Sequence, residues 1–85
     1  MIYNVAYAPS AEKALSKLPH DAQRRVIQSA DNLAENPRPP GCVKLSGQEN
    51  VYRVRVGTFR VVYQIEDRKL LVLVVRIAQR REVCR

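Results

Sequence analysis

The stretch of residues 51–65 constrains the fold most, because its pattern predicts a β-hairpin with two unlike faces. Apolar residues alternate with arginine or other residues on both sides of a Gly57-Thr58 pair. Such period-two alternation in β-branched and aromatic residues is typical of half-buried strands. Glycine at the first of two central positions favours a type II′ turn, whose twist matches that of the flanking strands. The second strand should therefore begin at once, with Phe59.

The polar face of this hairpin is basic. If the apolar residues share one face, then Arg53, Arg55 and Arg60 share the other. A polyanion would relieve the repulsion among the three guanidinium groups, whereas the alternative is a solvated face whose charges oppose aggregation. The formal net charge of +7 in 85 residues favours an anionic partner, which leaves nucleic acid, an acidic protein or a membrane surface.

The rest of the chain predicts two layers around one core, in a single domain spanning residues 1–85. The expected elements are a strand at 2–7, a helix opened by Pro9, a second helix capped by Asp21 and ended by Asn36 and Pro37, a short strand at 43–45, the hairpin, and a strand within 69–78. The last segment is the most apolar run of the chain, as expected of a central strand. If it pairs with the second hairpin strand, Arg76 and Arg80 fall on the side of Arg60.

Several classes of protein are disfavoured by what the sequence lacks. Two cysteines and one histidine are too few for a structural zinc site or a disulfide framework. No phosphate-binding loop, dinucleotide motif or Ser-His-Asp pattern occurs. We therefore expect neither a metal nor a cofactor. Because no apolar run approaches the roughly 18 residues that cross a bilayer, and no signal-peptide pattern opens the chain, we expect a cytoplasmic protein without a membrane partner.

The order of elements and several sequence motifs resemble the RelE branch of the RelE/ParE superfamily, the toxins of type II toxin–antitoxin pairs. The most specific motifs are YRVRVGTFRVVY at 52–63 and RIAQRREV at 76–83, and AENPRP at 34–39 and KLSG at 44–47 also fit. The resemblance implies an α+β, microbial-ribonuclease-like fold in which two N-terminal helices pack on a mainly antiparallel sheet of four to five strands. It also implies cleavage of mRNA in the ribosomal A site and inhibition of translation.

Carried over by position, the resemblance implies a metal-independent endoribonuclease that works with arginines. We expect Arg60 and Arg80 at the scissile phosphate, with Arg53 and Arg55 orienting the RNA near the attacking 2′-OH. Forked guanidinium donors can stabilise charge on the phosphoryl oxygens as a 2′,3′-cyclic phosphate forms and a 5′-OH leaves. Three further residues are expected to bind RNA, namely Lys44, Arg76 and Arg81.

The sequence departs from the family where proton transfer is expected. RelE-like toxins often carry a tyrosine after the Glu-Val pair, where this chain has Cys84. The usual Gly and His or Lys before the C-terminal arginine are Ala78 and Gln79 here. A positioned acid or base contributes about 10²–10⁴-fold, so slow cleavage is expected rather than none. Cys84, whose thiolate nearby arginines would favour, is one candidate replacement, and a terminal thiol without a role is the other.

The resemblance also implies partners, and it leaves alternatives open. A cognate antitoxin should fold onto the basic face, the ribosome and mRNA should be bound during cleavage, and operator DNA should be contacted only through the antitoxin complex. One alternative is a ParE-like inhibitor of DNA gyrase without nuclease chemistry. The other is a catalytically weakened RelE-fold module that binds RNA or the antitoxin.

Overall fold

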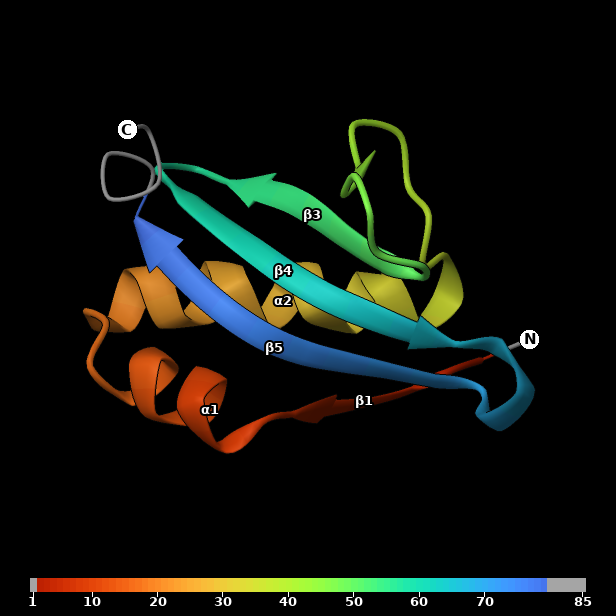
Figure 1. Cartoon of the computed structure of the whole chain (residues 1–85). Helices are drawn as coiled ribbons and strands as arrows, with labels where there is room; N and C mark the ends of the chain where they lie inside the picture. The colour runs from red at the N-terminus through yellow and green to blue at the C-terminus, as the bar shows by residue number, and fades with distance from the viewer. Residues whose placement is uncertain (1, 80–85) are drawn as a thin grey trace.

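The computed structural model describes residues 2–79, in which two helices pack on one face of a five-stranded sheet (Figure 1). The elements are β1 (Asn4–Tyr7), α1 (Pro9–Ser16), α2 (His20–Glu35), β2 (Val43–Lys44), β3 (Val51–Val56), β4 (Phe59–Glu66), the 3₁₀ turn η1 (Asp67–Lys69) and β5 (Leu71–Gln79). The strand order is β1-β5-β4-β3-β2, with β1 parallel to β5 and every other pair antiparallel. The predicted α+β fold with a mainly antiparallel sheet is confirmed.

The predicted hairpin is confirmed in its register and its turn. Val56 pairs with Phe59, so only Gly57 and Thr58 connect β3 to β4. Gly57 has a φ of +60°, and Thr58 does not adopt a positive φ. These are the backbone signs of a type II′ turn, in which only the first central residue needs the left-handed half of φ space.

The second helix begins two residues earlier than the sequence predicts, at His20 instead of Ala22. Pro19 occupies the N-cap position, and no side chain caps the helix there, so the prediction of Asp21 as the cap is wrong. Asp21 lies instead in the first turn, where a carboxylate interacts favourably with the positive end of the helix dipole. The helix ends at Glu35 with Asn36 at the C-cap position, so the predicted stop at Asn36 and Pro37 is confirmed. Among residues 2–79, no helix has both the length and the apolar character needed to cross a membrane.

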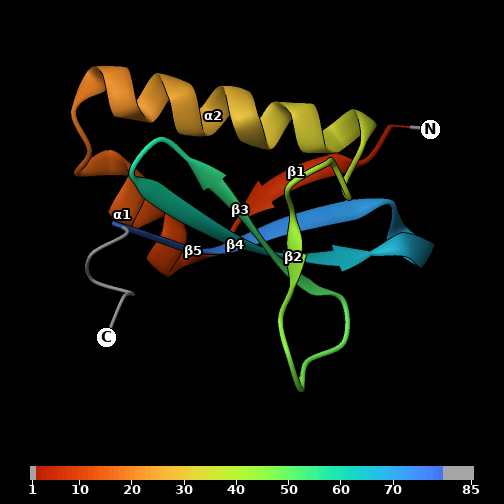
Figure 2. The same ribbon diagram turned by 90° about the horizontal axis from the view of Figure 1, so that it is seen from above.

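The hydrophobic core lies between the helices and one face of the sheet. It is formed by apolar side chains of α1, α2, β4 and β5, namely Ala11, Val26, Ala30, Leu33, Val61, Tyr63, Ile65, Val72, Val74 and Ile77. The two hairpin tyrosines point into this side as predicted, because Tyr63 is fully buried and Tyr52 stacks against it at a centroid distance of 6.0 Å. Figure 2 shows α2 on one side of the sheet and the 41–50 segment projecting on the other. We call the face turned away from the helices the open face.

A bulge in β5 decides which of its side chains reach the open face. On β4, Val62 and Tyr63 pair with Arg76 and Val74, which leaves Val75 without a partner on that strand. One extra residue inverts the alternation of the strand. Before the bulge the even-numbered residues of β5 face the helices, and after it the odd-numbered ones do. Arg76 is therefore turned toward the open face.

A polar cluster joins the segment after α2 to the β4–β5 connection. Arg38 forms an ion pair with Asp67, with Nη2 and Oδ2 3.0 Å apart, and its Nε donates a hydrogen bond to the Tyr52 hydroxyl at 3.1 Å. Asp67 also accepts a hydrogen bond from the Tyr3 hydroxyl at 2.7 Å. The hydrogen bonds from Arg38 and Tyr3 hold the pKa of Asp67 below its ordinary value. Because both ionic partners are exposed, the cluster positions the two segments more than it stabilises the fold.

Two buried tyrosine hydroxyls predict opposite effects of the same substitution. The Tyr63 hydroxyl donates a 2.7 Å hydrogen bond to the Pro37 carbonyl, so Tyr63→Phe leaves a buried acceptor unpaired and should lower the free energy of unfolding by about 1–2 kcal/mol. The Tyr7 hydroxyl oxygen is buried without a hydrogen-bond partner among residues 2–79, so Tyr7→Phe should be neutral or stabilise by up to about 1 kcal/mol. Urea unfolding of both variants measures the difference, and equal losses in the two would contradict this account.

Candidate functional site

The open face carries two rows of residues that run across β3, β4 and β5. Arg53, Val62 and Arg76 are paired in one row. The next row pairs Arg55 with Arg60, and Arg60 with Ala78. Residues paired across a sheet point to the same side, so the four arginines gather on one surface.

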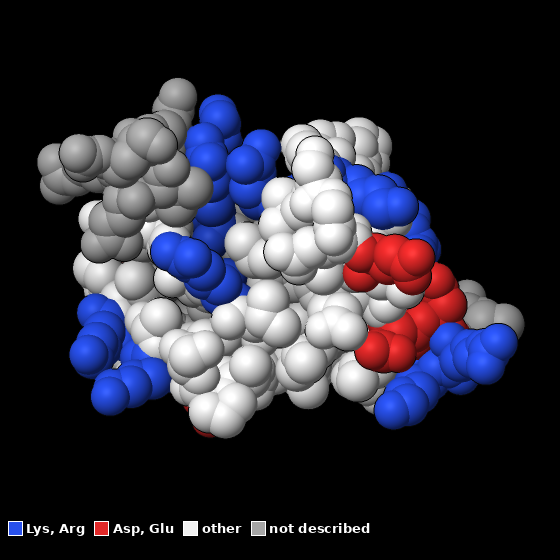
Figure 3. Space-filling view, in the orientation of Figure 1, with Lys and Arg blue, Asp and Glu red and all other residues white. Residues whose placement is uncertain are grey.

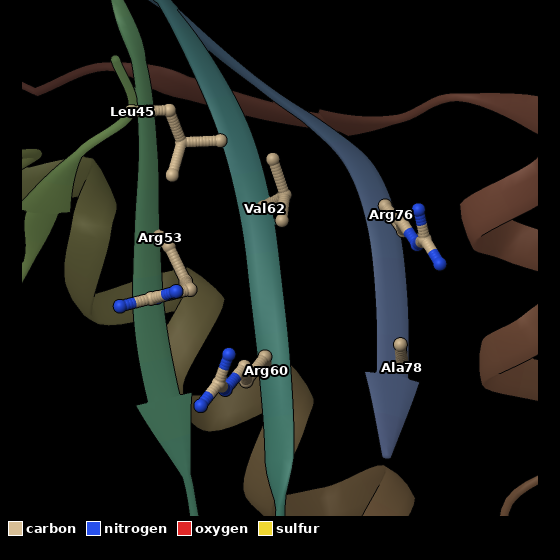
Figure 4. Close-up of a pocket in the computed structure, with 6 residues that line it drawn as sticks. All are labelled: Leu45, Arg53, Arg60, Val62, Arg76 and Ala78. Atoms are coloured by element: carbon tan, nitrogen blue, oxygen red, sulfur yellow. The ribbon is translucent and has the colours of Figure 1, made fainter. Parts of the chain in front are cut away.

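The two rows border two shallow hollows on this face. The first, of about 190 Å³, is lined by Leu45, Arg53, Arg60, Val62, Arg76 and Ala78. The second, of about 260 Å³, is lined by Gly41, Val43, Arg53, Arg55 and Arg60. Arg53 and Arg60 border both hollows. In Figure 4 the Arg60 side chain extends from β4 toward β3, the Arg53 side chain lies across β3, and the Arg76 side chain extends from β5 on the side away from β4. The floor of the first hollow is apolar and its rim is cationic.

The electrostatics of the open face favour an anion. None of the described residues that line the two hollows is acidic. Arg55 lies directly opposite Arg60, and like charges in directly opposite positions of a sheet repel each other. In Figure 3, basic side chains border the white centre of this face, whereas the acidic ones in view gather toward the β4–β5 connection. Among residues 2–79, no three His, Cys, Asp or Glu side chains converge as metal ligands would.

The site residues predicted from the sequence fall into three groups. Arg53, Arg55, Arg60 and Arg76 are brought together on the open face. Lys44 is exposed but is paired with Tyr52, so it points to the other side of the sheet from these arginines. The remaining predicted residues, Arg80, Arg81 and Cys84, lie outside the described residues.

The structure adds site residues that the sequence did not single out. Gly41, Val43 and Leu45, from the connection between α2 and β3, form the wall beside Arg53. The sequence suggested a strand at 43–45 but not its register. The pairing of Val43 with Arg53 is what turns this segment toward the open face.

Comparisons with known proteins agree with this geometry. The family model of the ParE toxin of type II toxin–antitoxin systems matches residues 5–84. A RelE-like toxin protein of Escherichia coli is 32% identical over 82 residues, covering 94% of this chain and 85% of the relative. Toxin RelE1 of Methanocaldococcus jannaschii is 33% identical over 87 residues, covering 96% of this chain and 93% of the relative.

Solved structures give the same result. The RelE–RelB complex of Pyrococcus horikoshii OT3 matches with a TM-score of 0.83 and 29% identity, covering 94% of this chain and 97% of that chain. The toxin–antitoxin complex RelBE2 of Mycobacterium tuberculosis matches with a TM-score of 0.82 and 28% identity, covering 94% of this chain and all of that chain. Fold, sequence motifs and family model agree, and the chain belongs to the RelE/ParE superfamily of type II toxins as a RelE-like member.

Proposed function

We propose that this protein is a metal-independent endoribonuclease toxin that cleaves mRNA in the ribosomal A site and so inhibits translation. The observation that carries the proposal is the set of four arginines around two hollows with no described acidic residue in their lining. A phosphodiester is an anion that such a surface can bind. Guanidinium groups suit it because they offer forked hydrogen-bond donors and stay charged near neutral pH.

In the proposed reaction the ribose 2′-OH attacks the adjacent phosphorus. The O2′–P bond forms, the P–O5′ bond breaks, and the products are a 2′,3′-cyclic phosphate and a 5′-OH. One proton leaves the 2′-OH and one reaches the departing oxygen. Arg60 and Arg80 are assigned to the scissile phosphate, where they stabilise charge on its oxygens, and Arg53 and Arg55 to the adjoining RNA.

Proton transfer is the weak point of this site. Arginine is a reluctant donor because it holds its proton so tightly, and Cys84 stands at the position of the family's C-terminal tyrosine. A chain without a positioned acid or base keeps electrostatic stabilisation but loses about 10²–10⁴-fold in rate. We therefore propose a slow nuclease, in which a Cys84 thiolate either takes a partial role or none.

A cognate antitoxin is the proposed protein partner. The structural relatives from Pyrococcus horikoshii and Mycobacterium tuberculosis are complexes with their antitoxins. By analogy, a segment that folds on binding would cover the open face, with acidic side chains on the arginines and apolar ones over Val62 and Leu45. Operator DNA would be contacted only through this complex. The site of action, the ribosome, places the free toxin in the cytoplasm.

The test is cleavage of mRNA on programmed ribosomes, with 5′ ends mapped, for the natural chain, Cys84→Tyr and Cys84→Ala. We expect slow cuts in the A-site codon, and a faster rate for Cys84→Tyr by up to about 10²-fold if the tyrosine restores proton transfer. A loss of rate in Cys84→Ala would assign the thiol a catalytic part, and an unchanged rate would leave the arginines sufficient. Absence of cutting in all three proteins would contradict the nuclease proposal.

A second candidate function follows from the family model, which is that of ParE toxins. A ParE-like protein would bind DNA gyrase and need no nuclease chemistry. Inhibition of supercoiling by purified gyrase, with translation unaffected, would favour this function. Inhibition of neither process would favour a module that binds RNA or the antitoxin without acting on it.

A further inference from the structure

Arg25 of α2 lies over the turn that joins the two arginine-bearing strands of the open face. A Cβ placed on Gly57 would be only 3.6 Å from Nη1 of Arg25, so the guanidinium group lies against the glycine backbone. Arg55 and Arg60 are the arginines nearest this turn in the sequence, two and three residues from Gly57. Cationic groups therefore flank the turn on both sides, from the open face and from the helix face.

A hollow of about 350 Å³ lies on the helix side of the same turn. Its lining includes Asp21, Arg25, Gly57, Thr58 and Gln79. Figures 1 and 2 place this end of the β3–β4 hairpin at the same end of the molecule as the first turns of α2. Among the described residues that line this hollow, Arg25 is the one cation and Asp21 the one carboxylate. Within residues 2–79, Arg25 forms no ion pair with a carboxylate at 4.0 Å or less.

We propose that this hollow is a second phosphate-binding site, in which Arg25 holds the backbone of the RNA strand after it leaves the open face across the β3–β4 turn. The proposal rests on the proposed function, because it extends the RNA-binding surface of that site. Three features support the path. Gly57 has no side chain to obstruct it, the Thr58 hydroxyl and the Gln79 amide can donate hydrogen bonds beside Arg25, and the arginines of the open face lie at its other end.

A regularly charged strand fits this layout better than an acidic peptide does. A nucleic acid backbone carries one charge per nucleotide and can follow cations that lie in sequence around an edge. Asp21 allows a second, opposite test of the proposal. Its carboxylate borders the same hollow and repels a phosphate held by Arg25. Removing this carboxylate should therefore strengthen RNA binding, in the opposite sense to removing the guanidinium group.

The test measures the affinity of the full chain for a 2′-O-methyl decanucleotide as a function of salt. This RNA cannot be cut by 2′-OH attack, so the result does not depend on whether the protein is a nuclease. Arg25→Gln should weaken binding roughly fivefold near 0.1 M salt and reduce the slope of log K against log salt by about 0.7, the value of one phosphate contact on a single strand. Arg25→Lys should keep the slope, and Asp21→Asn should raise the affinity.

The matched control is Arg24→Gln, which removes the same charge from the neighbouring exposed residue that does not line the hollow. Its effect on the affinity for the decanucleotide should be less than about half that of Arg25→Gln. A trinucleotide, too short to pass the turn, should bind Arg25→Gln and the natural chain alike. Equal losses of affinity in Arg25→Gln and Arg24→Gln would overturn the site. So would a loss in Arg25→Gln that appears when vacant ribosomes or an antitoxin peptide are bound but not when the decanucleotide is bound. If the natural chain fails to cut mRNA but these differences hold, only the nuclease function fails.

Discussion

Arg60→Ala is expected to reduce cleavage of mRNA on programmed ribosomes by about 10²–10³-fold, the usual cost of removing one group that stabilises charge in the transition state. Arg60 is the residue for which the geometry makes the strongest case. It borders both hollows, lies opposite Arg55 and is adjacent to the row that contains Arg53. Among the arginines in residues 2–79, Arg60 alone has two open-face arginines, Arg53 and Arg55, on one adjoining strand. A phosphate bound between the two strands would contact it.

Two further variants separate the charge of Arg60 from its shape. Arg60→Lys keeps the charge but loses the forked donor, so its rate should lie between those of the natural chain and Arg60→Ala. Arg68→Ala, in the exposed η1 turn at the other end of β4, removes an equal charge and should change the rate less than about twofold. Full activity of Arg60→Ala, with its thermal unfolding unchanged, would remove Arg60 from the mechanism.

Much of this surface was predictable because a hairpin leaves few choices. Alternation in residues 51–65 set which side chains share a face, and glycine at the turn set the register between the strands. Those two facts place Arg53, Arg55 and Arg60 together without knowledge of the remaining fold. Long-range pairing supplied the apolar neighbours of these arginines, so the hollows could not be predicted in the same way.

The position of Arg76 shows where local reasoning reaches its limit. Strict alternation from Val72 and Val74 would turn Arg76 toward the helices, into the core. Alternation read backward from the end of β5 turns it toward Arg60 instead. Because Val75 is an extra residue, the first alternation holds only up to Val74 and the second holds from Arg76 onward. Arg76 therefore follows the second and faces the same side as Arg60. No turn residue or glycine marks this bulge in the sequence.

Lys44 and Asp21 show a second limit, which arises at the ends of elements. A strand of two residues is too short for alternation to show which side chains point to which face of the sheet. Only the pairing of Lys44 with Tyr52 shows that the Lys44 side chain points away from the open face. Likewise Asp21 is a good capping residue by type. The backbone nevertheless enters the helix at His20, because Pro19 at the N-cap has an extended conformation that suits the start.

Leu33→Ala should be the most destabilising of the substitutions considered, with a loss of roughly 2–5 kcal/mol in the free energy of unfolding. Leu33 is only 1% exposed and belongs to the α2 stripe that packs on the sheet. The loss is a large part of the roughly 5–10 kcal/mol expected for a domain of this size, and should lower the Tm by roughly 10–30 °C. Ile27→Ala is the control, because Ile27 is on the same helix but 41% exposed. It should cost less than about 1 kcal/mol.

Comparing Leu33→Ala with Arg60→Ala separates the two roles that the sheet performs. The helices cover one face and hold the strands in place, so Leu33→Ala should lose cleavage activity only as its unfolded fraction grows with temperature. Any partner that binds the folded chain alone, including an antitoxin, should raise the Tm of this variant in proportion to RT ln(1 + [L]/Kd). Arg60→Ala should instead cleave about 10²–10³-fold more slowly than the natural chain even at temperatures where it is fully folded. If Leu33→Ala proved inactive at temperatures where it is folded, the separation of roles would be wrong. The positions of the open-face arginines would then depend on the packing of the helices against the other face of the sheet.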